Sequence, residues 1–143
     1  MYLADCHNHT CCSIDSQAPL ADMAAAAIRG GLSELCTTDH LDLIDRQGKI
    51  RESWDWQPLL DQYTQVKENG PKGLELRFGI EIGSAQFFPE WATQLLAQAP
   101  LDLVVGTAHN MRPSLGGLDY IVPHYEDESA CYAALDEYFD SLL

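Results

Sequence analysis

Short apolar runs alternate with amphipathic stretches along this chain, and the alternation predicts four strand–helix units in succession. The runs expected to form strands lie at Tyr2–His7, Leu32–Thr38, Leu74–Ile82 and Leu101–Thr107. Each is followed by a helical segment, and these segments begin at Pro19, Trp56, Pro89 and about Glu128. A succession of this kind indicates an α/β fold with a parallel sheet and right-handed crossover connections.

The apolar positions also predict which surfaces are buried. The segment Leu101–Thr107 is apolar enough to form a strand that is covered on both faces. In the last helix the large apolar residues recur at helical spacing, so their common face is expected to be buried. These residues are Tyr132, Leu135, Phe139 and Leu142.

Residues 1–143 are expected to form a single domain, because no linker, repeat or low-complexity segment interrupts the pattern. Four strand–helix units make about half of a (β/α) barrel, which typically needs roughly 250 residues. The last helix also reaches Leu142 and Leu143 without a Gly, Asn or Pro to end it. We therefore expect a domain truncated at its C-terminal side, although a complete four-stranded open sheet fits the pattern equally well. The open edges of a half barrel make a homodimer a candidate assembly.

Composition narrows the function classes. The chain has 8 Lys and Arg against 22 Asp and Glu, a net charge of -14, which disfavours nucleic acid and anionic membranes as partners. An acidic protein that handles phosphate needs another positive charge, and metal cations supply one. The five cysteines are odd in number and match no zinc-ribbon spacing, so we expect reduced thiols in a cytoplasmic protein. No signal peptide or membrane-length apolar run is visible.

Histidines gather where the predicted strands end. His7 and His9 close the first strand, His40 follows the second and His109 follows the fourth, while the third strand delivers Glu81. The C-terminal ends of parallel strands meet at one edge of a sheet, which is where α/β folds carry their functional groups. Four imidazoles and one carboxylate are therefore expected to converge there.

Each of these residues also has a plain structural interpretation. The spacing of His7 and His9 turns both side chains to one side of a strand, but an H-x-H pair alone is a weak signal. A single histidine such as His40 is commonly a surface residue. Glu81 is harder to explain in this way, because a carboxylate inside an apolar strand is rare unless it is paired or bound to metal.

Three acidic residues accompany the histidines. Asp15 is a candidate oxygen ligand, or alternatively the cap of a turn together with Ser16. Asp5 points to the same side as the first histidine pair and is expected to orient a ligating histidine. Asp39, directly before His40, is expected to support the site in the same indirect way.

The mixture of imidazole and carboxylate groups suits zinc, manganese or iron better than magnesium or calcium. One carboxylate among several imidazoles suggests a bridge between two ions. Arg112 follows His109 closely and is a candidate contact for a substrate phosphate, although a solvent-facing loop arginine is the favoured interpretation. His124 lies in a long loop away from any predicted strand end, and is the least favoured histidine.

These residues fall into four ordered motifs that resemble the PHP superfamily (polymerase and histidinol phosphatase). The motifs are Asp5-Cys6-His7-Asn8-His9 with Ser13-Ile14-Asp15-Ser16, then Thr38-Asp39-His40, Gly79-Ile80-Glu81-Ile82-Gly83 and Gly106-Thr107-Ala108-His109. The Ile-Asp-Ser form of the first motif and the sequence Pro123-His124-Tyr125 are most similar to the histidinol-phosphate phosphatase branch.

The resemblance implies a distorted (β/α)7 barrel, TIM-like, with two or three divalent ions at its C-terminal rim. By this resemblance His7 and His9 hold the first ion, Glu81 bridges the first and second, and His109 binds the second. Asp15 and His40 hold the third. The family also uses a further histidine and a late Asp-x-His, and this sequence has no positions that match them.

The implied reaction is hydrolysis of histidinol phosphate to histidinol and phosphate in histidine biosynthesis, with a metal-bound hydroxide bridged near Glu81 as the nucleophile. Three alternatives stay open: another small phosphorylated substrate, a half-barrel metal-binding or assembly module without activity of its own, and a small α/β domain with incidental histidines. The substrate-lining residues of a second half would separate histidinol phosphate from another phosphorylated substrate, and gel filtration would reveal the assembly module.

Overall fold

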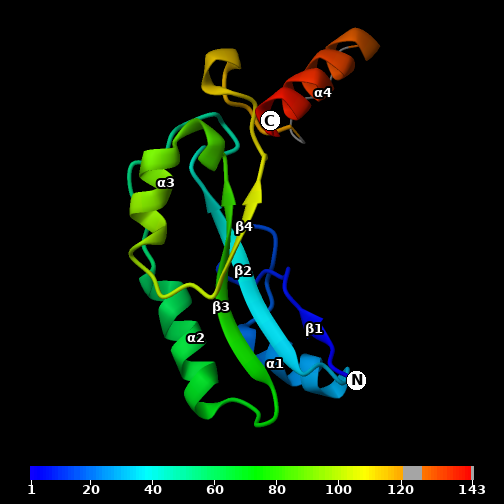
Figure 1. The fold of residues 1–143 in the computed structure, drawn as a ribbon, viewed down its shortest axis with the longest axis vertical. Coiled ribbons are helices and arrows are strands. Elements are labelled where there is room, and N and C mark those ends of the chain that lie inside the picture. The colour runs from blue at the N-terminus through cyan, green and yellow to red at the C-terminus, as the bar shows by residue number, and fades with distance from the viewer. Residues whose placement is uncertain (121–126, 143) are drawn as a thin grey trace. The chain divides into compact units, whose positions relative to one another are not determined.

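The protein is described here by a computed structural model that covers residues 1–120 and 127–142. These residues contain β1 (Ala4–Asp5), α1 (Leu20–Arg29), β2 (Glu34–Asp42), α2 (Gln57–Asn69), β3 (Glu75–Gly83), α3 (Pro89–Leu96), β4 (Leu103–Thr107) and α4 (Glu128–Leu142) (Figure 1). The strands follow one another in the sheet in the order β1-β2-β3-β4, and β1 pairs with β2 in parallel, Ala4 opposite Glu34. The predicted succession of strand–helix units is confirmed.

The chain divides into two compact units. The first comprises residues 1–40, 55–81 and 96–105, and the second comprises residues 41–54, 82–95 and the described chain from residue 106 onwards. Among the described helices, none combines the length and apolar character needed to cross a membrane.

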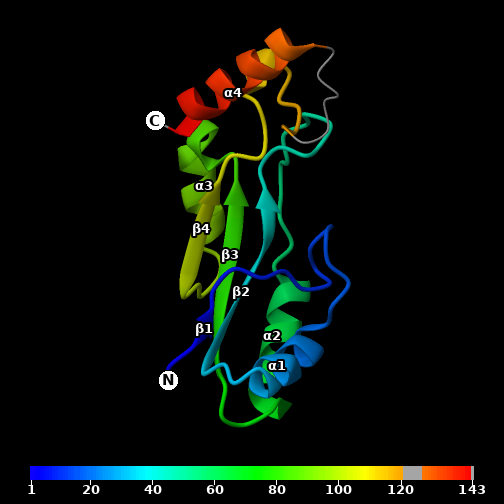
Figure 2. The same cartoon turned by 90° about the vertical axis from the view of Figure 1, so that its right-hand side faces the viewer.

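The first unit is built on an apolar layer between two helices and the sheet. Figure 2 shows α1 and α2 on the same face of β2 and β3. Pro19 precedes α1 with a fixed backbone angle suited to a helix start, and Asp22 lies in its positively charged first turn. The buried residues of this layer are Leu20, Ala24, Ala27, Leu35 and Val66. Their removal from water is the main force that fixes both helices on the sheet.

Strand β2 is longer than predicted. We expected it to end at Thr38, with His40 in the following loop, but it runs to Asp42 and contains both Asp39 and His40. In the sequence, the consecutive polar residues Asp39 and His40 are typical of a loop. Asp39 is nevertheless 2% exposed and accepts hydrogen bonds from the backbone N–H of Thr10 and the hydroxyl of Ser13. Leu41, two residues further along the strand, is fully buried. Satisfied hydrogen bonds allow a carboxylate to remain inside a strand.

The prediction that β4 is buried on both faces is wrong. Its residues alternate between half-buried and exposed, and Val104 is 43% exposed. Covered faces belong to interior parallel strands, whereas β4 is the last strand in the order of the described sheet and has a neighbour on one side only.

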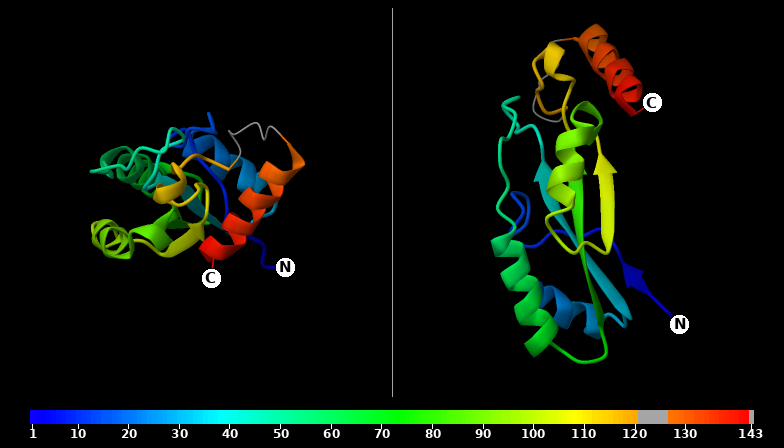
Figure 3. Two further views of the ribbon diagram at one scale, coloured as in Figure 1. Left: turned by 90° about the horizontal axis from the view of Figure 1, so that it is seen from above. Right: turned by 60° about the vertical axis from the view of Figure 1, so that its left-hand side comes forward.

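The predicted buried face of α4, the helix coloured orange to red in Figure 3, is also wrong. Its four large apolar residues are exposed, with Phe139 at 59%. The buried residues of this helix are Ala134, Glu137 and Ser141. The orientation follows from contacts inside the second unit: Glu137 accepts hydrogen bonds from Arg112, and the ring of Tyr138 lies 5.3 Å from that of Tyr120. These contacts turn the small and polar side of α4 inward.

Candidate metal centre

Glu81 is a buried carboxylate in the middle of an apolar strand. It is 4% exposed and lies in β3 between Ile80 and Ile82, which are buried as well. An ionised carboxylate in such a position is costly unless it has charged or hydrogen-bonding partners. The partners that the first unit supplies are imidazoles.

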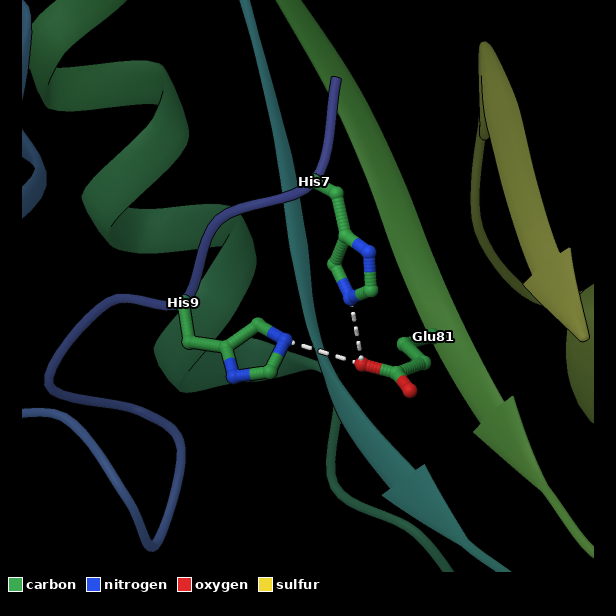
Figure 4. Close-up of side chains that lie close together, drawn as sticks. All are labelled: His7, His9 and Glu81. Atoms are coloured by element: carbon green, nitrogen blue, oxygen red, sulfur yellow. Dashed lines mark hydrogen bonds and ion pairs between the residues drawn. The ribbon is translucent and has the colours of Figure 1, made fainter. Parts of the chain in front are cut away.

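His7 and His9 both direct a ring nitrogen at the same oxygen of Glu81. The Nε2 atom of His7 lies 3.0 Å from Oε2, and the Nε2 atom of His9 lies 2.8 Å from it (Figure 4). The predicted common orientation of the two histidines is confirmed. Both histidines lie in the segment after β1, which approaches β3. The side chain of Asn8, which lies between them in the chain, points the other way.

Asn8 fixes this segment to β2. Its backbone N–H donates to Oγ1 of Thr38 at 2.9 Å, its side-chain amide donates to the carbonyl of Cys36 at 2.7 Å, and its carbonyl accepts from the Thr38 N–H at 2.9 Å. In an extended segment consecutive side chains point in opposite directions. Because Asn8 faces β2, the flanking histidines face the carboxylate.

Asp15 and His40 form a second group that shares His9. The Nδ1 atom of His9 lies 3.0 Å from Oδ2 of Asp15, and the Nε2 atom of His40 lies 3.3 Å from the same oxygen. Within each group, one donor atom per residue lies within 4.8 Å of the others. Burial raises the pKa of Asp15, but the hydrogen bond with His9 and the nearby imidazoles outweigh it and hold that pKa below its usual value.

A buried hydrogen-bond network holds the loop that carries His9 and Asp15. Oδ1 of Asp39 accepts from the backbone N–H of Thr10 at 2.7 Å and from Oγ of Ser13 at 2.7 Å. Oγ of Ser13 in turn accepts from the backbone N–H of His40 at 3.0 Å. Asp39 thus ties the loop to β2 beside His40, and its role in supporting a metal site stays a prediction. Asp5 accepts from the backbone N–H of His7 at 3.2 Å and does not contact the ring.

The chemistry of these groups fits a divalent metal. Each group offers two imidazole nitrogens and one carboxylate oxygen, a set that suits zinc, manganese or iron. Glu81 is nearly inaccessible to water, so a cation beside it would balance a charge that is otherwise difficult to bury. His7, His9 and Glu81 would hold one ion, and Asp15 and His40 would contribute to another.

His109 belongs to the second unit. Its Nδ1 atom lies 2.7 Å from Oδ1 of Asp42, and both residues are half-buried. Gly83 leaves the space for this pair, since an added Cβ would lie 2.0 Å from the Asp42 carboxylate and 3.1 Å from the His109 ring. The expectation that Glu81 bridges to an ion held by His109 stays a prediction. His124 lies outside the described residues.

Arg112 is bound to a carboxylate of its own unit. Its Nε donates to Oε1 of Glu137 at 2.7 Å, and its backbone N–H donates to the same oxygen at 3.1 Å. The hydrogen bond from the Arg112 side chain holds the pKa of Glu137 below its usual value. The predicted contact of Arg112 with a substrate phosphate stays a prediction.

The hydrogen-bonded pair of Arg112 and Glu137 predicts that the free energy of unfolding depends on pH. A lowered pKa in the folded state stabilises the fold above the pKa of an unfolded glutamate, about 4.3, and the effect is lost as the pH falls through the folded value. Replacing Glu137 with Gln is therefore expected to lower the free energy of unfolding at pH 7 and to have little effect near pH 3. Urea unfolding at both pH values measures this, with the exposed Asp136→Asn as control. An equal loss at both pH values would contradict the assignment.

Several residues of the site carry no recognisable signal in the sequence. Gln62 lies on the same side of α2 as apolar core residues, yet its Oε1 accepts from the backbone N–H of Leu20 at 2.6 Å and its Nε2 donates to Oγ1 of Thr10 at 2.9 Å. Asp42 was overlooked because β2 was expected to end earlier.

The family model described as PHP domain matches residues 5–143. The chain belongs to the PHP family. A curated relative, the histidinol-phosphatase of Lactococcus lactis subsp. lactis (strain IL1403), is 26% identical over 111 residues, which are 75% of this chain and 39% of the relative. The PHP membership and the similarity to the histidinol-phosphatase branch are thus confirmed.

A solved structure supports the same family membership. The histidinol phosphate phosphatase of Lactococcus lactis, complexed with zinc, L-histidinol and phosphate, matches with a TM-score of 0.67 and 25% identity, over 78% of this chain and 41% of that one. The PHP chain therefore spans about two fifths of the length of these relatives. The predicted fold class, parallel strand–helix repeats forming about half of a PHP barrel, is confirmed.

Proposed function

We propose that this PHP chain carries metal ligands of a phosphomonoesterase that converts histidinol phosphate and water into histidinol and phosphate in cytoplasmic histidine biosynthesis. The observation that carries the proposal is the convergence of His7 and His9 on the buried carboxylate of Glu81, with Asp15 and His40 beside them. The similarity to histidinol-phosphatases over most of this chain supports the substrate class.

The protein's own residues have defined tasks in this proposal. Glu81 supplies a buried anionic oxygen, and the two imidazoles at that oxygen orient a first ion. Asp15 and His40 contribute to a further ion, for a total of two or three ions of zinc, manganese or iron. Divalent ions bound in this way activate water and neutralise the phosphoryl oxygens. With a net charge of -14, the chain depends on such cations to attract a phosphorylated substrate.

The test is phosphate release by the purified chain after loading with zinc or manganese. We expect hydrolysis of histidinol phosphate in preference to glycerol phosphate, and loss of that hydrolysis in Glu81→Gln but not in Glu68→Gln, an exposed glutamate of the same unit. Equal rates on both substrates would replace the substrate assignment with a general PHP phosphoesterase. Zinc binding without hydrolysis of either substrate would exclude an independent phosphatase.

A second candidate is a metal-binding module that acts only after assembly with a partner. The exposed apolar face of α4 and the exposed Val104 of β4 favour this candidate, because apolar side chains of this size are usually covered. It predicts a homodimer or larger species in gel filtration. It also predicts that the specific phosphatase activity, the rate per chain, rises with protein concentration. A monomer at every concentration would exclude self-assembly.

A further inference from the structure

Two adjacent thiols occupy the loop between His9 and Asp15 and have no part in the metal centre. Cys11 is exposed and Cys12 is half-buried. Both belong to the first unit, and the remaining cysteines, Cys6, Cys36 and Cys131, lie elsewhere in the sequence. Adjacent cysteines are a distinctive chemical group because both sulfurs can bind a single atom.

Both sulfurs lie against the side-chain amide of one residue. The thiol of Cys11 donates to Oε1 of Gln62 at 3.7 Å, and Nε2 of Gln62 donates to the sulfur of Cys12 at 3.3 Å. The orientation of this amide is fixed, because its oxygen also accepts from the Leu20 N–H and its nitrogen also donates to Thr10. The two thiols are therefore held on the same side of the loop.

A direct bond between these two sulfurs is disfavoured. Adjacent Cα atoms lie about 3.8 Å apart across a trans peptide, whereas disulfides usually join Cα atoms about 4.4–6.8 Å apart. A larger atom inserted between the sulfurs removes this restriction, since it adds a second bond to the bridge. The pair therefore suits a thiophilic atom that takes two sulfur ligands.

We propose that Cys11 and Cys12 form a dithiol site for trivalent arsenicals. An aryl arsenous acid, R–As(OH)2, would react with both thiols to give R–As(S)2 and two molecules of water. Two As–S bonds replace two As–O bonds, the two thiol protons leave with the hydroxyl groups, and arsenic keeps its oxidation state. The site is separate from the proposed phosphatase reaction and requires no bound metal.

Occupation of the site would disturb the neighbouring metal ligands. The bridged sulfurs would lose their contacts with Gln62, which also holds Thr10, the residue next to His9. We expect zinc and the arsenical to weaken each other's binding by about 5-fold or more, because coupling between two sites is reciprocal.

The experiment uses the metal-free chain and phenylarsine oxide, followed by a wash with excess glutathione, a monothiol. We expect one adduct per chain in the intact mass, resistant to glutathione and removed by dimercaptopropanol, a dithiol. Cys11→Ser and Cys12→Ser should each lose the resistant adduct, whereas Cys6→Ser and Cys131→Ser should keep it.

Circular dichroism establishes that each variant is folded. A resistant adduct that survives in Cys11→Ser or Cys12→Ser, or that is absent from the unmodified chain, would overturn the proposal. Because the readout is mass, the outcome is independent of whether the chain hydrolyses any phosphate. A chelator competition with and without the arsenical measures the coupling, and an unchanged zinc affinity would show that the thiols and the metal ligands are independent.

Discussion

Replacing Glu81 with Gln is expected to weaken zinc binding by more than 100-fold. Loss of a residue that merely supports a metal ligand costs roughly 10- to 100-fold in affinity, and Glu81 is the group at which both His7 and His9 converge. Glutamine has nearly the same shape but no charge, so the variant isolates the role of the anionic oxygen. Competition with a chromophoric chelator measures the affinity.

The same variant is not expected to lower the stability of the metal-free fold. Burying an ionised carboxylate costs far more than burying a neutral amide, and glutamine of similar volume can still accept a hydrogen bond from an imidazole. We therefore expect metal-free Glu81→Gln to be at least as stable toward urea as the unmodified chain. Added zinc should stabilise the unmodified chain strongly and the variant little, because ligand binding to the folded state raises stability by mass action.

Glu68→Gln is the matched control, because it removes the same charge from an exposed position on α2. Its zinc affinity should equal that of the unmodified chain. If Glu81→Gln binds zinc as tightly as this control, the carboxylate is a structural ion-pair partner of the histidines and the metal centre lies elsewhere. If the variant is unfolded without metal, the loss of affinity has no bearing on ligation.

The part of the centre that could be predicted from the sequence follows from local geometry. The two-residue spacing of His7 and His9 determines their common direction, and the position of Glu81 inside an apolar strand indicates that the carboxylate needs a partner. The parallel arrangement of the strands then brings the segment after β1 toward β3. No long-range information beyond the strand–helix succession was needed for this convergence.

The supporting residues could not be predicted in the same way. Gln62 and Thr10 are 52 positions apart and meet only because α2 packs beside the loop. The exposed face of α4 was misjudged for a related reason. Helical spacing predicts that an apolar face exists but not which surface is available to cover it, and the Arg112–Glu137 pair decides which side of α4 turns inward in the described part of the second unit.

Substitution of Asp39 is the second change for which we expect a large effect, in this case on the free energy of unfolding. Replacing it with Ala is expected to lower the free energy of unfolding by about 3 kcal/mol, because the buried N–H of Thr10 and the hydroxyl of Ser13 would lose their acceptor. Asn keeps one acceptor oxygen and should cost less than Ala. Urea unfolding of the metal-free chain measures both changes, and Asp136→Ala, which removes an exposed carboxylate from α4, is the control.

The hydrogen bonds of Asp39 go to Thr10 and Ser13 and not to the candidate metal ligands, so an effect on zinc would come from the position of the loop. Asp39 bonds Thr10, which follows His9 in the chain, and Ser13, which lies two residues before Asp15. The same network reaches the backbone of His40. We therefore expect Asp39→Asn to weaken zinc binding by roughly 10-fold while the chain stays folded. An unchanged affinity in a destabilised Asp39→Asn variant would mean that the loop keeps its ligand geometry without this carboxylate, and that Asp39 contributes to folding alone.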